Sequence, residues 1–406
     1  MENSKAARRF YFPALALCWL STHSGLISYV LKNPQSASVP ILLFQFLAVI
    51  LRLGALFYLL GLAVAAGRFC LNRIKVDFDS SAERFVLEAA LGLGVLSHAL
   101  FALGLCGLWT QVDFEACLIL GAYPAVKSLG RFRSRFSWPA LGAWQVIIPA
   151  LIISLAALAG VLIANAPPSD WDSLSVHLEM PRIYSAHGGF VPVTWMFHGM
   201  DAMAAGLFFV PPLVFGDPSL AAVFMLLFQG LMAGALFVAG RQMFGARAAL
   251  FAVAIFLVEP AVAERSGTPG SDFAVGLFGM LAFWTAWRWQ STGRGQWLLL
   301  SGALTGLGAV TKITGILMAA ALGALIVFET LRQKRPWKWP ASWCLLALLF
   351  SGPWLMRAAY HMGNPLWPHF AGIFDRSSRA LWISERSLRS VEAGVGQGLK
   401  EFFLVP

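Results

Sequence analysis

The chain has 406 residues, of which 58% are hydrophobic and only 12% charged, and its mean hydropathy is +0.70. A soluble domain carries about twice this share of charged residues, so the composition excludes a soluble globular protein. The formal net charge of +10 does not indicate nucleic-acid binding, because the basic residues stand in short clusters between apolar segments, as they do in the cytoplasmic loops of membrane proteins.

Apolar runs of about 17–25 residues recur along the chain, and each can cross a hydrocarbon core of about 30 Å. The predicted fold class is all-α, a polytopic membrane helical bundle. The runs are continuous and do not alternate, which excludes a transmembrane barrel. We expect about eleven transmembrane helices, near residues 11–30, 39–66, 86–108, 113–127, 142–165, 218–240, 247–264, 273–289, 297–312, 313–329 and 342–358.

The spans divide the chain into three predicted parts. Residues 1–135 form an N-terminal four-helix membrane block, and 140–358 form a membrane core with an outer loop at 166–200. Residues 359–406 form a tail outside the membrane. The cysteines lie in or beside apolar runs and lack CxxC spacing, so we expect small core hydrophobes rather than disulfides or a metal site. They are Cys18, Cys70, Cys106, Cys117 and Cys344.

The basic clusters fall on alternate connections, which sets the predicted orientation. One side, taken as cytoplasmic, holds Lys5, Arg8, Arg9, Arg68, Arg73, Lys75, Arg84, Lys127, Arg131, Arg133, Arg135, Arg241, Arg247, Arg288, Arg294, Arg332, Lys334, Arg335 and Lys338. The outer loop, the turn around Asp272 and the tail from Met362 then share the opposite face. This requires that 200–216, interrupted by Pro211 and Pro212, is a re-entrant or interfacial helix. Segments 297–329 predict a broken helix pair, tolerated where protein or a cavity covers the backbone.

The outer loop carries the densest group of polar side chains. Asp170 and Asp172 flank Trp171, so both carboxylates could ligate one Mg²⁺ or Mn²⁺ ion, or one could act as a general base. The alternative is that one of them caps the following helix and the other is solvated.

Residues 173–187 are expected to be helical, so that side chains three or four apart share a face. His177 then lies on one side with Tyr184, and Glu179 and Arg182 lie roughly on another. We expect His177, Glu179 and Arg182 to bind donor or acceptor. The alternatives are an interfacial hydrogen bond for His177 and a surface ion pair for Glu179 and Arg182.

Two charged residues stand at the edges of later apolar segments. Asp272 follows a Gly/Pro/Ser stretch and opens the next span; it is either a site residue or a helix N-cap. Lys312 lies in a glycine-rich apolar segment, where an ammonium usually marks a site or a cavity. It suits a lipid-borne phosphate, and snorkelling to the headgroups is the alternative. Gly302 and Gly306 form a GxxxG motif that predicts close helix packing.

The segment Pro353–Pro368 is rich in turn formers and interfacial aromatic residues, typical of a belt followed by a tight turn. Arg357 could pair with phosphate. Asn364 is included with it among the residues expected to bind donor or acceptor.

These stretches together resemble the bacterial GT-C glycosyltransferases, in particular those similar to protein O-mannosyltransferases and to the aminoarabinose transferase of lipid A. The run Trp171–Pro181 looks like their acidic motif and Tyr-His-Leu-Pro-like run, with Val176 where an aromatic residue is usual. Asp272, the run Gly302–Lys312 and the segment Pro353–Pro365 match later motifs in the same order. The resemblance covers about 140–370.

The resemblance implies an enzyme of the bacterial inner membrane, with its site facing outward, that uses a polyprenyl-phosphate sugar as donor and usually inverts the anomeric carbon. Asp172 would be the catalytic carboxylate, supported by Asp170 and Asp272, and Lys312 would hold the donor phosphate. The acceptor is unknown, and membrane lipids are the other expected partners. Family members usually continue with further spans, so a chain that ends at Pro406 is expected to be either truncated or a short variant of the family.

Two other classes of function were weighed against a transferase. A transporter would favour inverted repeats and carboxylates at the membrane midplane, and the sequence has neither. A non-catalytic assembly subunit is made credible by the short tail. Transfer from a lipid-linked donor is the function that the sequence favours.

Overall fold

The described residues form a helical bundle. The computed structural model describes residues 39–130, 143–193, 196 and 198–374. The predicted span 11–30 lies outside the described residues, and so do the basic residues Lys5, Arg8, Arg9, Arg131, Arg133 and Arg135. Within the described part the chain is helical and contains no strand. The all-α fold class is therefore confirmed.

Six described helices are long and apolar enough to cross a membrane. They are α2 (Val39–Ile74, with its apolar part from Leu43), α3 (Ser81–Leu105), α5 (Ala143–Asn165, apolar from Trp144), α8 (Pro218–Phe244), α13 (Thr314–Arg332) and α14 (Lys338–Met362). Each exceeds or approaches the roughly 20 residues that a span needs.

Other predicted spans coincide with shorter or less apolar helices. These are α4 (Gln111–Gly130), α9 (Ala246–Val258), α11 (Asp272–Thr292) and α12 (Gly295–Ala309). The prediction of one continuous span over 247–264 is wrong: the helix ends at Val258, and Glu259 accepts a hydrogen bond from Val262 N to start the separate helix α10 (Pro260–Arg265). A proline at the first turn of α10 cannot continue the hydrogen-bond ladder of α9.

The segment 200–216 does not form a membrane-length helix. It contains a 3₁₀ turn, η2 (Gly206–Phe209), and the short helix α7 (Val210–Val214). Both are buried between α6 (Glu179–Ala186) and α8. Together they are far shorter than the roughly 30 Å hydrocarbon core, so α8 starts at the same end of the bundle at which the outer loop lies.

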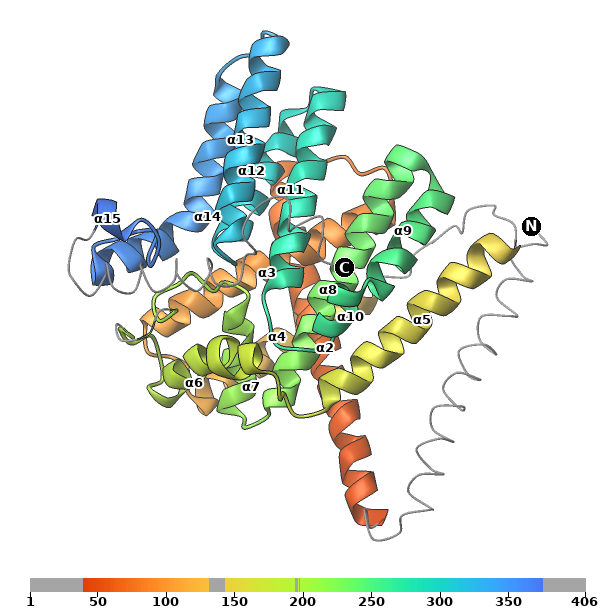
Figure 1. Ribbon diagram of the computed structural model, residues 1–406, viewed down its shortest axis with the longest axis vertical. Coiled ribbons are helices and arrows are strands. Elements are labelled where there is room, and N and C mark those ends of the chain that lie inside the picture. Colours follow the sequence, from red (N-terminus) through yellow and green to blue (C-terminus); the bar gives the residue numbers. More distant parts are fainter. Residues whose placement is uncertain (1–38, 131–142, 194–195, 197, 375–406) are drawn as a thin grey trace, which may run out of the picture.

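Helix α12 packs between α11 and α14, and it also contacts α13 and α3 (Figure 1). A Cβ on Gly302 would lie 2.5 Å from Trp343 O, and one on Gly306 would lie 2.3 Å from Ala347 O. The two helix backbones can approach this closely only with glycine at both positions. The close packing predicted from the GxxxG motif is confirmed.

The break between α12 and α13 falls at residues 310–313, within the segment 297–329 that was predicted to form a broken helix pair. Val310 and Thr311 are buried there, and Val310 O accepts a hydrogen bond from Ala204 N at 2.9 Å. The 198–206 segment thus covers backbone that the broken helices leave without an intrahelical partner.

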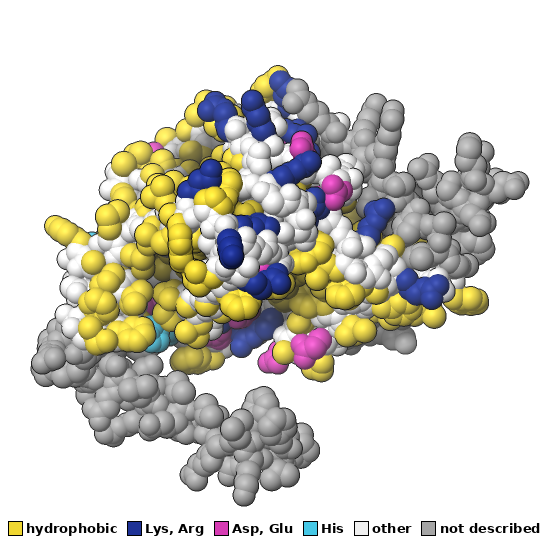
Figure 2. Space-filling view, turned by 90° about the horizontal axis from the view of Figure 1, so that it is seen from above, with side chains coloured by type: hydrophobic (Ala, Val, Ile, Leu, Met, Phe, Trp, Pro, Cys, Tyr) yellow, Lys and Arg dark blue, Asp and Glu magenta, His cyan; other side chains and the backbone are white. Residues whose placement is uncertain are grey.

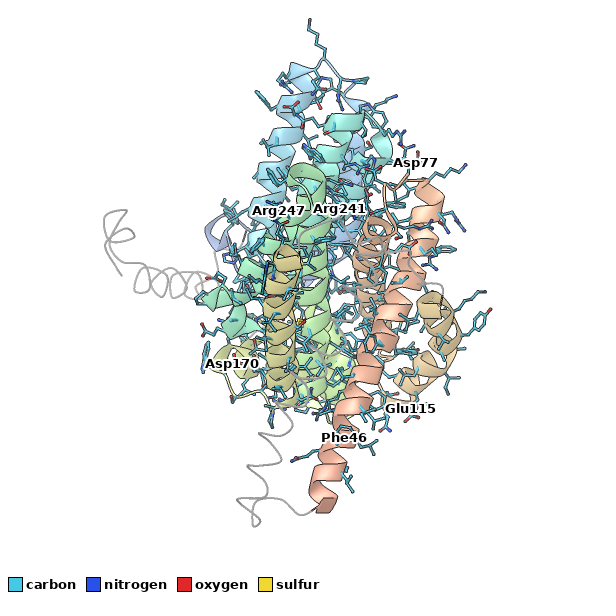
Figure 3. All side chains as sticks on the ribbon, turned by 90° about the vertical axis from the view of Figure 1, so that its right-hand side faces the viewer. Phe46, Asp77, Glu115, Asp170, Arg241 and Arg247 are labelled. Carbon is cyan, nitrogen blue, oxygen red and sulfur yellow. The ribbon has the colours of Figure 1, made fainter. Side chains whose placement is uncertain are left out.

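Basic side chains gather at one end of the bundle, called here the basic end and formed by the connections at 75–80, 245, 293–294 and 333–337. Figure 2 shows Lys and Arg side chains spread over this face. Figure 3 places Arg241, Arg247 and Asp77 toward it and Asp170 and Glu115 toward the other. Arg288, only 7% exposed, lies 2.8 Å from Asp79 and 3.0 Å from Glu83, which ties the start of α3 to α11. The described basic residues of the 68–84, 241–247, 288–294 and 332–338 stretches therefore share one end, as their alternation predicted. Lys127 is not placed there, because Ala125 beside it packs against Gly61 in the middle of α2.

The opposite end is held by an aromatic cluster that joins the outer loop to the helices. Its rings are those of Phe101, Trp109, Tyr184, Phe190 and Trp354, with neighbouring centroids 4.7–6.1 Å apart. Such pairs add stability beyond the apolar area that they bury.

The cysteine prediction is wrong in part. Cys70 is half-buried, but Cys106, Cys117 and Cys344 are exposed on the bundle surface, and all four are free thiols. In a membrane-spanning bundle an outward-facing apolar residue meets lipid rather than core, because lipid tails are as apolar as the interior. Cys18 lies outside the described residues.

Candidate functional site

A cavity of about 260 Å³ opens at the end of the bundle opposite the basic end. Its walls come from residues 172–177, 198–206, 271, 309–316, 354–358 and 365–369. The outer loop, the start of α11, the break before α13 and the end of α14 with its following turn therefore converge on one space. The sequence analysis expected these stretches to share a face.

Asp172 lines this cavity. It stands just before the π-helical turn η1 (Ser173–His177), and its side chain makes no capping hydrogen bond. Its Oδ2 atom lies 3.2 Å from Arg265 Nη1 and 3.6 Å from His177 Nε2. Because both contacts are made by Oδ2, Oδ1 is the oxygen left to meet a ligand. The side chain is 35% exposed.

Asp170 has a different role. Its Oδ1 atom accepts a hydrogen bond from Ser173 N at 2.8 Å, and the residue does not line the cavity. Burial raises the pKa of this carboxyl, but hydrogen bonds from Ser173 and the charge of Arg265 outweigh burial, so the net pKa lies below its usual value. The alternative in which one aspartate caps the following turn therefore describes Asp170.

Lys312 and Asp272 form an ion pair across two helix starts. Lys312 lies in the break before α13, and its Nζ atom is 2.5 Å from Asp272 Oδ1 in the first turn of α11. Ser271 holds the N-cap position, so Asp272 is not the cap. Lys312 lines the cavity and keeps 35% of its side chain exposed. Its ammonium is paired rather than snorkelling alone.

His177 lies among these charged groups. Its ring is 17% exposed. Burial is the main cause that lowers the pKa of His177; Lys312 and His198 lower it further, while Asp172 and Asp272 raise it without reversing the shift. The imidazole is therefore expected to be neutral at pH 7. Four charged or titratable groups from separate segments thus act on one ring at the cavity wall.

Glu179 and Arg182 do not line the cavity. They face each other along α6, with Arg182 Nη2 2.7 Å from Glu179 Oε1, and the arginine is largely exposed. The hydrogen bond and the charge of Arg182 lower the pKa of the glutamate carboxyl. The geometry matches the surface ion pair considered above, which contributes under about 1 kcal/mol.

Arg357 is buried behind the cavity wall, and two of its guanidinium nitrogens, Nε and Nη1, have no hydrogen-bond partner among the described residues. Its Nη2 donates to Tyr184 Oη at 2.7 Å, and the guanidinium lies 4.4 Å from the centroid of the Phe190 ring. Tyr184 Oη in turn donates to Gly199 O at 2.9 Å. Arg357 thereby supports the segment that carries His198 and Asp201.

Asn364 is fully buried and organises the turn after α14. Its Nδ2 donates to His369 O at 2.7 Å, and its Oδ1 accepts from Leu366 N at 2.8 Å. The side chain thus shapes the segment 365–369 that lines the cavity. This local bonding is the role that the structure gives to Asn364.

Sequence reasoning missed His198 and Asp201. His198 Nδ1 lies 2.7 Å from Asp201 Oδ2, and both residues line the cavity. The signal was a His-x-x-Asp spacing inside an otherwise apolar stretch that was considered only for its membrane topology. Arg265, which lies shortly before Asp272 in the chain, is brought to Asp172 by the fold.

A divalent metal was expected between Asp170 and Asp172. The described residues contain no group of three or more His, Cys, Asp or Glu side chains that could hold a metal ion. Asp170 Oδ1 accepts a hydrogen bond from Ser173 N, and Asp172 Oδ2 is held by Arg265 and His177. A role for Mg²⁺ or Mn²⁺ stays a prediction.

The family described as dolichyl-phosphate-mannose-protein mannosyltransferase matches residues 210–356. The matched segment includes Asp272 and Lys312. No curated protein and no solved structure matches the chain. The family match supports a membrane glycosyltransferase of the GT-C type, the class that the sequence motifs resemble. The apolar helices agree with an integral membrane protein.

Proposed function

We propose that this protein transfers a sugar from a polyprenyl-phosphate donor to an acceptor at the outer face of the bacterial inner membrane, with inversion at the anomeric carbon. The observation that carries the proposal is that Asp172 and Lys312 both line one cavity at the end of a membrane bundle. In a transfer reaction a carboxylate can accept the proton of the acceptor hydroxyl. An ammonium that lines the same cavity can stabilise the negative charge that develops on the leaving group.

In the proposed reaction the acceptor hydroxyl attacks the anomeric carbon of the donor. Asp172 takes the proton of that hydroxyl as the new glycosidic bond forms. The bond between the anomeric carbon and the phosphate oxygen breaks with its electron pair, which leaves polyprenyl phosphate. Lys312 stabilises the negative charge on that phosphate, and Asp272 holds Lys312 at the helix break.

The surroundings of Asp172 support this role. Arg265 and His177 both hold the Oδ2 atom, which orients the carboxylate and leaves Oδ1 for the acceptor proton. Burial lowers the pKa of His177, so at pH 7 we expect the ring to add no full positive charge beside the base. The apolar lining at Val176, Ile313 and Ile316 suits the first isoprene units of a lipid donor.

The test is release of polyprenyl phosphate by the purified chain, supplied with labelled polyprenyl-phosphate sugars, for the wild type and for Asp172→Asn. We expect the variant to lose at least about 100-fold in rate, within the range of general-base catalysis, with unchanged folding. The matched control is Glu115→Gln, at an exposed site on α4 that does not line the cavity. Equal release by Asp172→Asn and wild type would remove Asp172 from the mechanism.

A protein without catalysis, either an assembly subunit or a transporter, is the competing class. It predicts that the wild type releases no polyprenyl phosphate from any donor in the panel. That result, obtained with a protein that still binds the lipid, would overturn the proposed function.

A further inference from the structure

The cavity has a second polar wall that the proposed reaction does not use. Asp201, Trp354 and Trp367 line it. They come from the loop before η2, from α14 and from the turn after α14. Asp172 and Lys312 belong to other segments, the residues just before η1 and the break before α13. The second wall therefore needs an explanation of its own.

Three polar atoms in this wall are buried without hydrogen-bond partners among the described residues: Asp201 Oδ1, Trp354 Nε1 and Trp367 Nε1. A buried polar atom without a partner costs about 1–3 kcal/mol. Native proteins carry few of them, and each calls for a reason such as a missing ligand. Here one acceptor and two donors without partners belong to residues of the same cavity.

Hydrogen bonds to the segment 198–201 fix the position of Asp201, as a ligand-binding side chain requires. Its other oxygen, Oδ2, lies 2.7 Å from His198 Nδ1. The adjacent Gly199 carbonyl is fixed by the hydroxyl of Tyr184, which itself accepts from the buried Arg357. Burial is the main cause that raises the pKa of Tyr184, so the phenol keeps its proton and can donate to Gly199. The segment 198–201 is thus anchored on both sides of Met200.

The chemistry of the wall selects a class of ligand. A carboxylate oxygen accepts hydrogen bonds from hydroxyl groups, and indole N–H groups donate hydrogen bonds to them. A prenyl chain would leave all three polar atoms unpaired. A phosphate would meet the negative charge of Asp201. A neutral polyhydroxyl ring satisfies both kinds of polar atom together.

We propose that Asp201, Trp354 and Trp367 form the subsite for the hydroxyl groups of the transferred sugar, and that Asp201 determines specificity for neutral sugars. The inference rests on the proposed function, because it assigns the phosphate end of the donor to Lys312. Asp172 and Lys312 line the same cavity as Asp201, Trp354 and Trp367. One lipid-linked monosaccharide can then contact both walls.

The experiment compares the binding of two lipids to the purified full chain in detergent: polyprenyl phosphate, and polyprenyl phosphate carrying a neutral hexose. The variants are Asp201→Asn, which keeps the shape of the side chain, and Trp354→Phe, which removes the indole N–H. Glu115→Gln is the control. Retained elution volume and melting temperature identify the variants that fold.

We expect the wild type to bind the hexose lipid about tenfold or more tightly than the bare phosphate, the gain from one or two hydrogen bonds to a charged group. Asp201→Asn should lose most of this gain and leave affinity for the bare lipid unchanged, and Trp354→Phe should lose part of it. A lipid carrying a uronic acid should gain little in the wild type.

Two results would overturn the inference, and they are distinguishable. If the bare lipid binds but the hexose adds no affinity, or if Asp201→Asn keeps the full gain, the subsite is wrong while the proposed donor class stands. If the wild type binds neither lipid, the proposed function fails and the sugar subsite fails with it.

Discussion

Replacing Lys312 tests whether the ammonium serves the leaving phosphate or only the fold. Within the described part of the chain Lys312 pairs with Asp272 alone, and the two side chains are 35% and 44% exposed. An ion pair with this exposure contributes about 0–1 kcal/mol to stability. Lys312→Gln should therefore fold normally, with a melting temperature within a few degrees of the wild type.

The effect on transfer should be larger than the effect on folding. A full charge about 4 Å from a phosphate contributes up to about 4 kcal/mol at an effective dielectric constant near 20. Because the lysine is one-third exposed and water screens it, we expect about half of that value. This corresponds to a loss of roughly 10- to 100-fold in kcat/KM.

The assay is release of polyprenyl phosphate at several donor concentrations, with Lys312→Arg as the variant that keeps the charge. Lys312→Arg should retain most of the activity that Lys312→Gln loses. The reasoning is refuted if Lys312→Gln stays within twofold of the wild type in kcat/KM. It is refuted also if the variant loses activity only because it no longer folds.

Three further predictions concern the supports of the site. Asp170→Ala should lower the free energy of unfolding by about 1 kcal/mol, the usual effect of losing an N-cap, and should keep most of the turnover; a loss of turnover that Mn²⁺ restores would instead make Asp170 a metal ligand. Gly306→Leu should lower the melting temperature sharply, because a Cβ there would lie 2.3 Å from Ala347 O and overpacking costs about 1–3 kcal/mol or more; unchanged melting would contradict the close packing of α12 and α14. Burial lowers the pKa of His177 from 6.5, so the unfolded chain binds this proton at a higher pH than the folded chain does. The contribution of His177 to stability is then complete above pH 6.5 and is lost as pH falls below it; melting temperatures measured from pH 7.5 to 5 should fall less steeply for His177→Gln than for the wild type, and parallel curves would show that this ring is not the source.

The residues most easily predicted were those whose role depends on their own neighbourhood in the chain. Asp170 is three residues before the amide that it caps, and Glu179 and Arg182 are one helical turn apart. Short-range geometry of this kind is fixed by backbone conformation. For both, the sequence analysis weighed the local alternative that the structure describes.

Other residues gained their place at the site only through the cavity that the packed segments enclose. Asn364 was expected at a binding site; its two amide atoms are bonded to the turn that follows it, and that turn lines the cavity. His198 and Asp201 were overlooked because two polar side chains in an apolar stretch give no pattern until the cavity beside them is known. The predicted span 247–264 was too long because a hydropathy reading does not register the local effect of Pro260 on the helix.

The sequence by itself determined that this protein is a helical membrane bundle with its basic connections at one end. Hydrocarbon enforces that outcome, because a spanning backbone must satisfy its own hydrogen bonds and charge is costly inside the membrane. The tertiary structure alone decided which polar groups meet: Asp172 with Arg265, Asp272 with Lys312, and Arg357 with Tyr184. These partners lie 93, 40 and 173 residues apart in the chain, and only the packing of helices against one another brings such residues within hydrogen-bonding distance.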